Sequence, residues 1–146
     1  MHISVGSDHR GYKVKAKIIE QLERLGHSTS DAGTNSDDSV DYPDIANEVG
    51  RSVSQGGSDR GILICGTGIG MAIAANKHKG VRAATCHDTV TAEMSRRHNN
   101  LNILCLSADL FGERSVEQLV SIWLETEFEG GRHERRLSKI SDTEDH

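Results

Sequence analysis

Aromatic residues are scarce in this sequence of 146 residues, which has two Phe, two Tyr and one Trp. That scarcity argues against a protein that binds single-stranded nucleic acid by stacking bases on aromatic rings. An excess of positive charge is also lacking, because 17 Lys and Arg stand against 22 Asp and Glu, for a formal net charge of −5. We therefore expect no general binding of nucleic acid and none of an anionic membrane surface.

Long hydrophobic runs are missing as well. No apolar run approaches the roughly 18 residues that a membrane-spanning helix needs, and the first residues, MHISVGSDHRG, lack the basic and apolar segments of a signal peptide. The three cysteines, Cys65, Cys86 and Cys105, are odd in number and form neither a CxxC pair nor the Cys/His spacing of a zinc site. We expect reduced thiols, no structural metal and a cytoplasmic protein.

Short apolar runs alternate with segments of helical period, which is the pattern of parallel strands joined by helices. The expected strands are residues 3–6, 27–32, 61–65, 81–85 and 103–106. The run 61–65 (GILIC) is apolar throughout, as in a strand covered on both faces. The pattern predicts an α/β fold, with one doubly wound domain of three layers over residues 1–146 and a five-stranded parallel sheet. Its site should lie at the carboxyl ends of the strands.

Helical periods fill the intervals between these strands. The clearest is residues 116–124, where apolar positions repeat on one face. Asp44 is expected to cap a helix that follows a long polar loop. The segment 71–76 (MAIAAN) is apolar nearly all round, which predicts a buried helix. A glycine pair at 130–131 predicts a turn before a last short helix, with a mobile tail from about 138 to 146.

A glycine-rich turn, Gly66-Thr67-Gly68-Ile69-Gly70, follows the strand 61–65 and leads into a helix. Backbone N–H groups can converge on an anion at such a turn. The third glycine comes one residue too early for the dinucleotide-binding fingerprint, and the Gly-Lys-Ser/Thr ending of a P-loop is absent. The turn therefore predicts either an anion site or a close approach of helix and strand, and the residues alone leave both open.

Cys65 stands immediately before this turn. Buried free cysteines commonly serve as small apolar residues, and that interpretation suffices for Cys86 and Cys105. A thiol at the start of a helix, however, forms the thiolate more readily and can act as a base or a nucleophile. We therefore single out Cys65 as the candidate reactive thiol.

Other polar residues lie near the ends of the expected strands or of the long loop. They are Asp8, His9, Tyr42, His98 and Asn99. Taken singly, each fits a surface, turn or capping role equally well. Arg132 and Arg136 are four residues apart, which on a helix places both guanidinium groups on one face. That arrangement suits bidentate binding of a phosphate, although a solvated helix face is the simpler interpretation.

Five segments combine these residues: GSDHRG (6–11), DYPD (41–44), GILICGTGIGMAIAANK (61–77), RRHNN (96–100) and EGGRHERR (129–136). In this order and spacing they resemble the ribose-5-phosphate isomerase B family, which also includes the galactose-6-phosphate isomerase subunits. The resemblance runs from Ser4 to about Ile140. It implies a Rossmann-like domain with a five-stranded parallel sheet. It also implies a homodimer or homotetramer whose sites are shared across the interface.

The resemblance further implies interconversion of ribose 5-phosphate and ribulose 5-phosphate through a cis-enediolate, without metal or cofactor. The implied catalytic residues are Cys65 as the base, His98 as the group that opens the sugar ring, and Thr67 near it. The galactose-6-phosphate subunits lack this cysteine, so Cys65 favours the ribose type. The implied substrate-binding residues are Asp8, Tyr42 and Asn99 for sugar oxygens, Gly66, Gly68 and Gly70 for the enediolate oxygen, and His9, Arg132 and Arg136 for the phosphate, with the Arg pair contributed by the neighbouring subunit.

One position departs from the family pattern. Many members have an arginine after the fifth strand, in a G-x-R-x-x-G context, that reaches the phosphate, whereas Asp109 stands there in this sequence. A carboxylate beside a phosphate is unfavourable. Asp109 therefore points away, Arg114 substitutes for the arginine, or the substrate is another sugar phosphate such as a six-carbon aldose phosphate. A non-catalytic sugar-phosphate-binding protein is a further alternative, against which Cys65 and His98 argue.

Overall fold

The structure, a computed structural model, describes residues 1–110 and 112–145. Over these residues it contains a five-stranded, all-parallel sheet in the order β2-β1-β3-β5-β4. The strands are β1 (His2–Ser7), β2 (Ser28–Asp31), β3 (Arg60–Cys65), β4 (Ala83–Thr85) and β5 (Ile103–Ser107). The predicted α/β class and the parallel sheet are confirmed.

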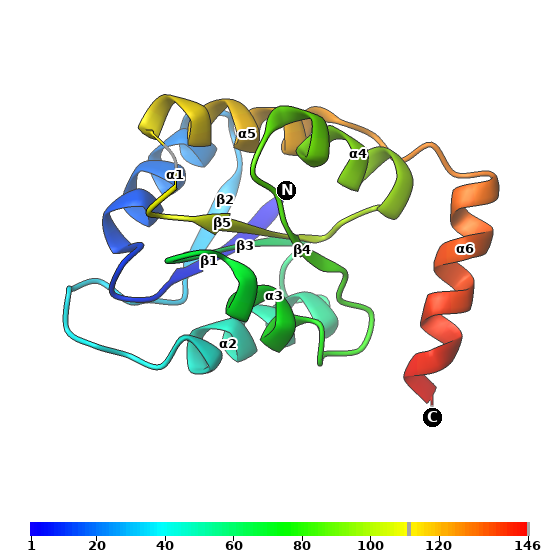
Figure 1. Cartoon of the computed structure of the whole chain (residues 1–146), viewed down its shortest axis with the longest axis horizontal. Helices are drawn as coiled ribbons and strands as arrows, with labels where there is room; N and C mark the ends of the chain where they lie inside the picture. The colour runs from blue at the N-terminus through cyan, green and yellow to red at the C-terminus, as the bar shows by residue number, and fades with distance from the viewer. Residues whose placement is uncertain (111, 146) are drawn as a thin grey trace.

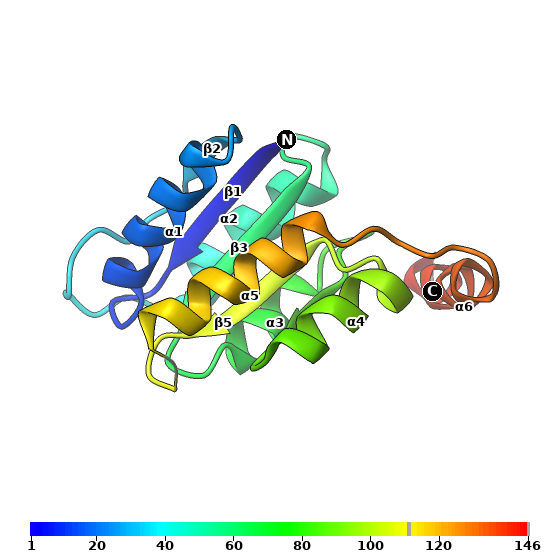
Figure 2. The same cartoon turned by 90° about the horizontal axis from the view of Figure 1, so that it is seen from above.

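Two layers of helices cover the sheet, as Figure 1 shows. On one face lie α1 (Tyr12–Arg24), α4 (Thr89–Asn99) and α5 (Glu113–Glu125), and on the other lie α2 (Tyr42–Ser54) and α3 (Ile69–Ala75). The last helix, α6 (Arg132–Ser141), stands beside the sheet, apart from both layers (Figures 1 and 2). The three-layer arrangement is therefore the predicted one, with one helix outside it.

Strand β3 explains why the two layers form. Its side chains alternate between two apolar clusters, so that Ile62 and Ile64 pack with Trp123 on the side of α1 and α5. Leu63 and Cys65 pack on the opposite side with residues that include Met71 of α3. Because both faces of a central parallel strand are buried, an uninterrupted apolar run is what such a strand requires.

Two local expectations are wrong. Helix α2 begins at Tyr42 with Asp41 as its N-cap residue, so Asp44 lies in the first turn and does not cap the helix. Pro43 stands in that first turn, where its fixed φ and its missing N–H cost nothing. Helix α3 is not buried on all sides, because Ile69 is 54% and Ile73 60% exposed. Burial in the core of this chain therefore does not account for all the apolar residues of this helix.

The C-terminal region is helical as far as it is described. The expected tail from about 138 coincides with the end of α6 and with a short 3-10 helix, η1 (Asp142–Asp145). His146 lies outside the described residues. Within residues 1–110 and 112–145, no helix has the length and apolar character needed to cross a membrane.

Candidate active site

The carboxyl ends of β1 and β3 are neighbours in the sheet, and the chain leaves them toward opposite faces, to α1 and α3. Such a switch point is the usual place for a ligand site in an open α/β sheet. A cavity of about 590 Å³ opens there. It is lined by Asp8, Arg10, Tyr42, Cys65, Gly66, Thr67, Ile69, Gly70, Ile73 and Asp109. The cavity thus brings together a large part of the residues expected to bind or convert the substrate.

Cys65 ends β3 at this cavity and is 5% exposed. The backbone N–H of Gly68 donates a hydrogen bond to its sulfur, with an N···Sγ distance of 3.1 Å. This hydrogen bond joins the end of β3 to the glycine turn and holds the sulfur beside the cavity. Cys86 and Cys105 are also free and buried, but burial raises the pKa of both thiols. Their interpretation as core residues fits this environment, and Cys65 is the thiol that borders the cavity.

The glycine turn shows the close packing that is one of the two uses the sequence leaves open. Gly68 has φ of 82°, in the left-handed region, and is packed tightly. A Cβ atom there would lie 2.9 Å from Cγ2 of Thr85 and 3.1 Å from the carbonyl oxygen of Leu106. At Gly70 a Cβ atom would lie 2.5 Å from the ring of Tyr42. Close packing therefore accounts for two of the glycines, while the same turn aims an N–H group at Cys65.

We expect Gly68→Ala to lower the free energy of unfolding by about 2–3 kcal/mol, because an L side chain is strained at this φ and also meets fixed atoms. Turnover should fall as well, since the N–H of residue 68 would move off the Cys65 sulfur. Thermal and denaturant unfolding measure the first effect. Gly56→Ala is the matched control, because Gly56 has φ of 78° and open space around it. Equal destabilisation by the two substitutions would contradict this role of close packing.

Asp8 and Tyr42 both line the cavity. Asp8 is buried, with 6% exposure, and its Oδ1 accepts a hydrogen bond of 2.9 Å from the backbone N–H of Arg10. Tyr42 opens α2, lines the cavity and is 41% exposed. His9 differs, because it is not among the residues that line the cavity. Its Nδ1 instead accepts from the N–H of Val40 in the long loop, at 3.2 Å.

Asp109 lines the cavity, so the first of the three alternatives for this position, a side chain that points away, does not hold. Its Oδ2 lies 2.6 Å from NH2 of Arg10, and both side chains line the cavity with Cys65. Arg114 is not among the residues that line this cavity, and it lines a separate groove with residues such as Thr89 and Gln118. Sequence reasoning missed Arg10, although it stands beside Asp8 and His9 in the GSDHRG segment.

His98 and Asn99 lie in the last turn of α4, shortly before the start of β5. Cys65 pairs with Ser107 at the other end of β5, and a strand of this length spans about 15 Å. Asn99 lines a different groove together with Leu137 and Ile140 of α6. Within one chain, the structure therefore does not bring His98 and Asn99 to the Cys65 cavity.

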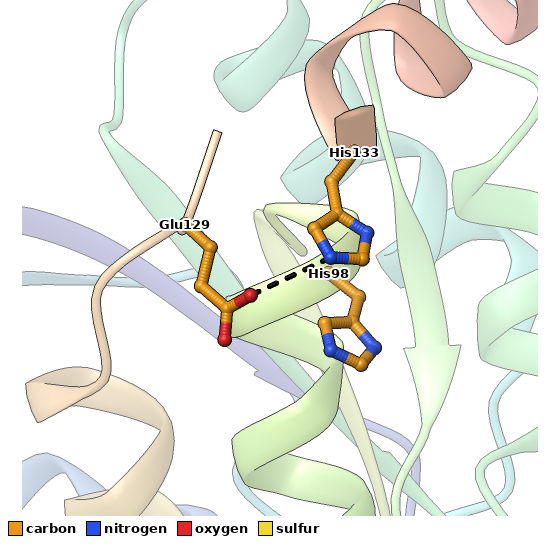
Figure 3. Close-up of side chains that lie close together, drawn as sticks. All are labelled: His98, Glu129 and His133. Atoms are coloured by element: carbon orange, nitrogen blue, oxygen red, sulfur yellow. Dashed lines mark ion pairs between the residues drawn. The ribbon is translucent and has the colours of Figure 1, made fainter. Parts of the chain in front are cut away.

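The surroundings of His98 were not foreseen from the sequence. Its ring stacks on that of His133 in α6, with centroids 4.2 Å apart and planes 10° apart (Figure 3). Nε2 of His133 lies 3.5 Å from Oε2 of Glu129, which also pairs with Arg97. Arg132 and Arg136 are exposed on the same helix α6. A second group of predicted site residues therefore gathers around α6, away from Cys65.

Three of these side chains could be taken for a metal site. His98, Glu129 and His133 are the described residues whose ligand atoms cluster, all within 4.8 Å of one another. A tetrahedral metal needs lone pairs that converge on one point about 2 Å from each nitrogen. Parallel stacked rings direct their lone pairs side by side, and Arg97 already engages Glu129. The arrangement as it stands does not fit a metal ion.

Arg96 fixes the end of α4 that carries His98. The buried guanidinium donates to the carbonyl oxygen of Leu101 at 2.6 Å and to Oδ1 of Asn100 at 2.9 Å. It also reaches the carbonyl oxygen of Thr126, at 3.3 Å, in the segment that leads to α6. Burial, and then Arg60 and Arg82, lower the pKa of Arg96 to about 10, so it stays charged at neutral pH.

We expect acid to destabilise the protein partly through His133. Burial, and then the neighbouring His98 and Arg132, lower the pKa of His133 below its ordinary value of 6.5, with Glu129 opposing them and Arg136 adding to them. The unfolded chain therefore takes up this proton first, and the free energy of unfolding falls as the pH drops below 6.5. Denaturant unfolding from pH 7.5 to 5.5 should show a smaller fall in His133→Asn. Identical pH profiles would contradict the prediction.

Known proteins share this architecture. The family described as Ribose/Galactose Isomerase matches residues 3–140. The chain is 41% identical over 139 residues to ribose-5-phosphate isomerase B of Escherichia coli, covering 95% of this chain and 93% of that protein. A ribose-5-phosphate isomerase B structure from Clostridium thermocellum superposes with a TM-score of 0.97 at 47% identity, covering 99% and 98% of the two chains.

A third relative carries a ligand. The ribose-5-phosphate isomerase B structure from Mycoplasma genitalium with bound ribulose-5-phosphate superposes with a TM-score of 0.96 at 42% identity, covering 99% of this chain and 97% of that chain. The likeness spans nearly the whole length of both proteins, and the family match takes in the Cys65 cavity and α6 alike. This chain therefore belongs to the ribose/galactose isomerase family and is an isomerase.

Proposed function

We propose that this isomerase interconverts ribose 5-phosphate and ribulose 5-phosphate, with Cys65 as the base. One observation carries the proposal: the Cys65 sulfur borders a cavity of about 590 Å³ and accepts a hydrogen bond from Gly68 at 3.1 Å. The relative from Mycoplasma genitalium, which binds ribulose-5-phosphate, supports the choice of sugar.

In this proposal the thiolate of Cys65 removes the proton from C2 of the open-chain aldose. The C1–C2 double bond forms and negative charge moves to O1, giving the cis-enediolate. Backbone N–H groups of the turn from Gly66 to Gly70 stabilise that charge as it develops. The proton returns to C1, the O2 hydroxyl proton moves to O1, and a carbonyl remains at C2. Thr67 lies at the same edge of the cavity, and Asp8 and Tyr42 hold sugar oxygens.

The remaining residues of the proposed site come from a second copy of the chain. His98 opens the furanose ring, Asn99 holds a sugar oxygen, and Arg132 and Arg136 bind the phosphate. Two observations support this division. These residues lie away from the Cys65 cavity within one chain, and the cavity mouth exposes apolar side chains, Ile69 and Ile73, that a second copy would cover. We therefore propose a homodimer, alone or as half of a homotetramer. We also propose that His9 contributes to binding the phosphate of the substrate.

Asp109 at the cavity keeps a second candidate open, which is an isomerase for another sugar phosphate, such as a six-carbon aldose phosphate. A panel of four-, five- and six-carbon aldose phosphates tests the choice, with kcat/KM measured for each. We expect the highest value for ribose 5-phosphate. A higher value for a six-carbon aldose phosphate would overturn the proposed substrate and leave the isomerase chemistry standing.

A further inference from the structure

The Cys65 cavity is lined by more acidic than basic side chains, although a phosphorylated substrate is itself negatively charged. Asp8 and Asp109 are the acidic residues among the described side chains of its lining, and Arg10 is the only basic one there. A sugar phosphate brings about two negative charges at neutral pH. Arg132 and Arg136 of the same chain lie on α6, outside this lining. Among the described side chains of this lining, the cation available to the ligand is therefore Arg10.

Arg10 is held at both ends. Its backbone N–H donates to Oδ1 of Asp8 at 2.9 Å, which fixes the turn after β1. Its guanidinium pairs with Oδ2 of Asp109 at 2.6 Å. A Cβ atom on Gly66 would lie 3.4 Å from Nε of Arg10 and 3.2 Å from Oδ2 of Asp109, so the pair lies against the glycine turn. The guanidinium therefore lies against the glycine turn, next to the proposed site of reaction.

Asp109 is itself tied to that turn. The N–H of Ala108 donates to the carbonyl oxygen of Cys65 at 2.8 Å. The hydroxyl of Ser107 donates to the carbonyl oxygen of Gly66 at 2.6 Å and accepts from the N–H of Asp109 at 3.2 Å. These hydrogen bonds attach the loop after β5 to the end of β3 and the turn that follows it. The side chain of Asp109 extends from this loop to Arg10.

We propose that Arg10, positioned by Asp109, binds the phosphate group of the substrate at this cavity and sets the preference for phosphorylated sugars. This inference rests on the proposed function in that it takes the substrate to be a sugar phosphate. A guanidinium has five N–H donors, so pairing with one carboxylate leaves donors for a phosphate. The Arg10 side chain is 59% exposed, which leaves it accessible to a ligand. The cation thus comes from the loop after β1, and position 109 in the loop after β5 supplies its carboxylate partner.

Asp109 has two opposing effects in this arrangement. It orients the guanidinium, and its own negative charge weakens the attraction of the site for a dianion. Asp109→Asn keeps a hydrogen-bond acceptor for Arg10 and removes the charge, so it should tighten phosphate binding about threefold. Arg10→Gln removes the cation and leaves Asp109 without its partner, so it should weaken binding about tenfold or more.

The test measures the dissociation constant of ribose 5-phosphate by calorimetry in a Cys65→Ala background, which removes turnover. Arg10→Gln, Asp109→Asn and the exchanged pair Arg10→Asp with Asp109→Arg are compared in that background. We expect the exchanged pair to bind more tightly than Arg10→Gln, because it restores a cation against a carboxylate. Arg24→Gln is the matched control, since Arg24 pairs with Glu117 at 3.3 Å, is 62% exposed and lies in a different groove.

An unchanged dissociation constant in Arg10→Gln would overturn the inference, and so would equal weakening by Asp109→Asn, which would make the pair merely structural. Competitive inhibition of the Cys65-containing enzyme by inorganic phosphate gives a second readout, and it should weaken in Arg10→Gln alone. The substrate panel separates this inference from the proposed function. If another sugar phosphate is the best substrate, the same variants are compared with that compound, and the loss in Arg10→Gln is still expected.

Discussion

Replacing Cys65 by alanine is expected to lower kcat about a thousandfold, while the dissociation constant of ribose 5-phosphate changes little. The sulfur lies at the cavity and accepts a hydrogen bond from the backbone N–H of Gly68, at 3.1 Å. Binding should survive because Asp8, Tyr42 and Arg10 line the cavity independently of the thiol. A coupled assay for the ketose measures turnover, and calorimetry measures binding.

Two further cysteine variants make this result specific. Cys65→Ser keeps the size of the side chain and a partner for the Gly68 N–H, but a hydroxyl does not ionise near neutral pH, so it should be almost as inactive as Cys65→Ala. Cys86→Ala removes a thiol that is buried outside the cavity lining and should retain turnover. If Cys65→Ser or Cys65→Ala kept wild-type kcat, the thiolate base would have to be abandoned.

Mixing two inactive variants, Cys65→Ala and His98→Asn, is expected to restore activity. If each site combines the Cys65 cavity of one copy with the α4 and α6 residues of the other, a mixed dimer contains one intact site and one doubly altered site. About half of the dimers in a random one-to-one mixture are mixed, so about a quarter of the wild-type activity should return. The separation of His98 from Cys65 within one chain motivates this prediction.

The control pairs two changes on the same side of the proposed site, Cys65→Ala with Asp8→Asn. Both residues line one cavity, so every site in a mixed dimer carries one lesion and no activity should return. Native mass spectrometry verifies that mixed dimers form in each case. Mixed dimers of Cys65→Ala and His98→Asn that stay inactive would show that the sites are not shared in this way.

Local patterns were enough to predict the sheet. The run GILIC must be covered on both faces, and β3 is indeed the central strand with a layer of helices on each side. Helix α3 shows where such reasoning stops. Ile69 and Ile73 are as apolar as the core residue Met71, yet they are exposed. The apolar character of a side chain indicates that its burial is favourable. It does not indicate whether residues of the same chain or of a second copy bury it.

Site residues could be predicted where the residues that act together are also neighbours in the sequence. Cys65 and the glycines after it are adjacent in sequence, so their relation to a strand end and a helix start could be inferred. The pair of Arg10 and Asp109 could not, because 98 positions separate residues that the parallel order of β1, β3 and β5 brings together. His98 was placed ahead of the fifth strand correctly, but that position puts it at the amino end of β5, away from the cavity.

Ribose 5-phosphate with deuterium at C2 tests the central claim most directly, because Cys65 is held to remove that hydrogen. The label is followed by NMR in ordinary water, with wild type and Cys65→Ala both saturated with the compound. We predict that the wild-type protein forms ribulose 5-phosphate with loss of deuterium from C2, more slowly than with the unlabelled sugar, and that Cys65→Ala leaves the label in place. Loss of the label at the same rate in both proteins would contradict the account.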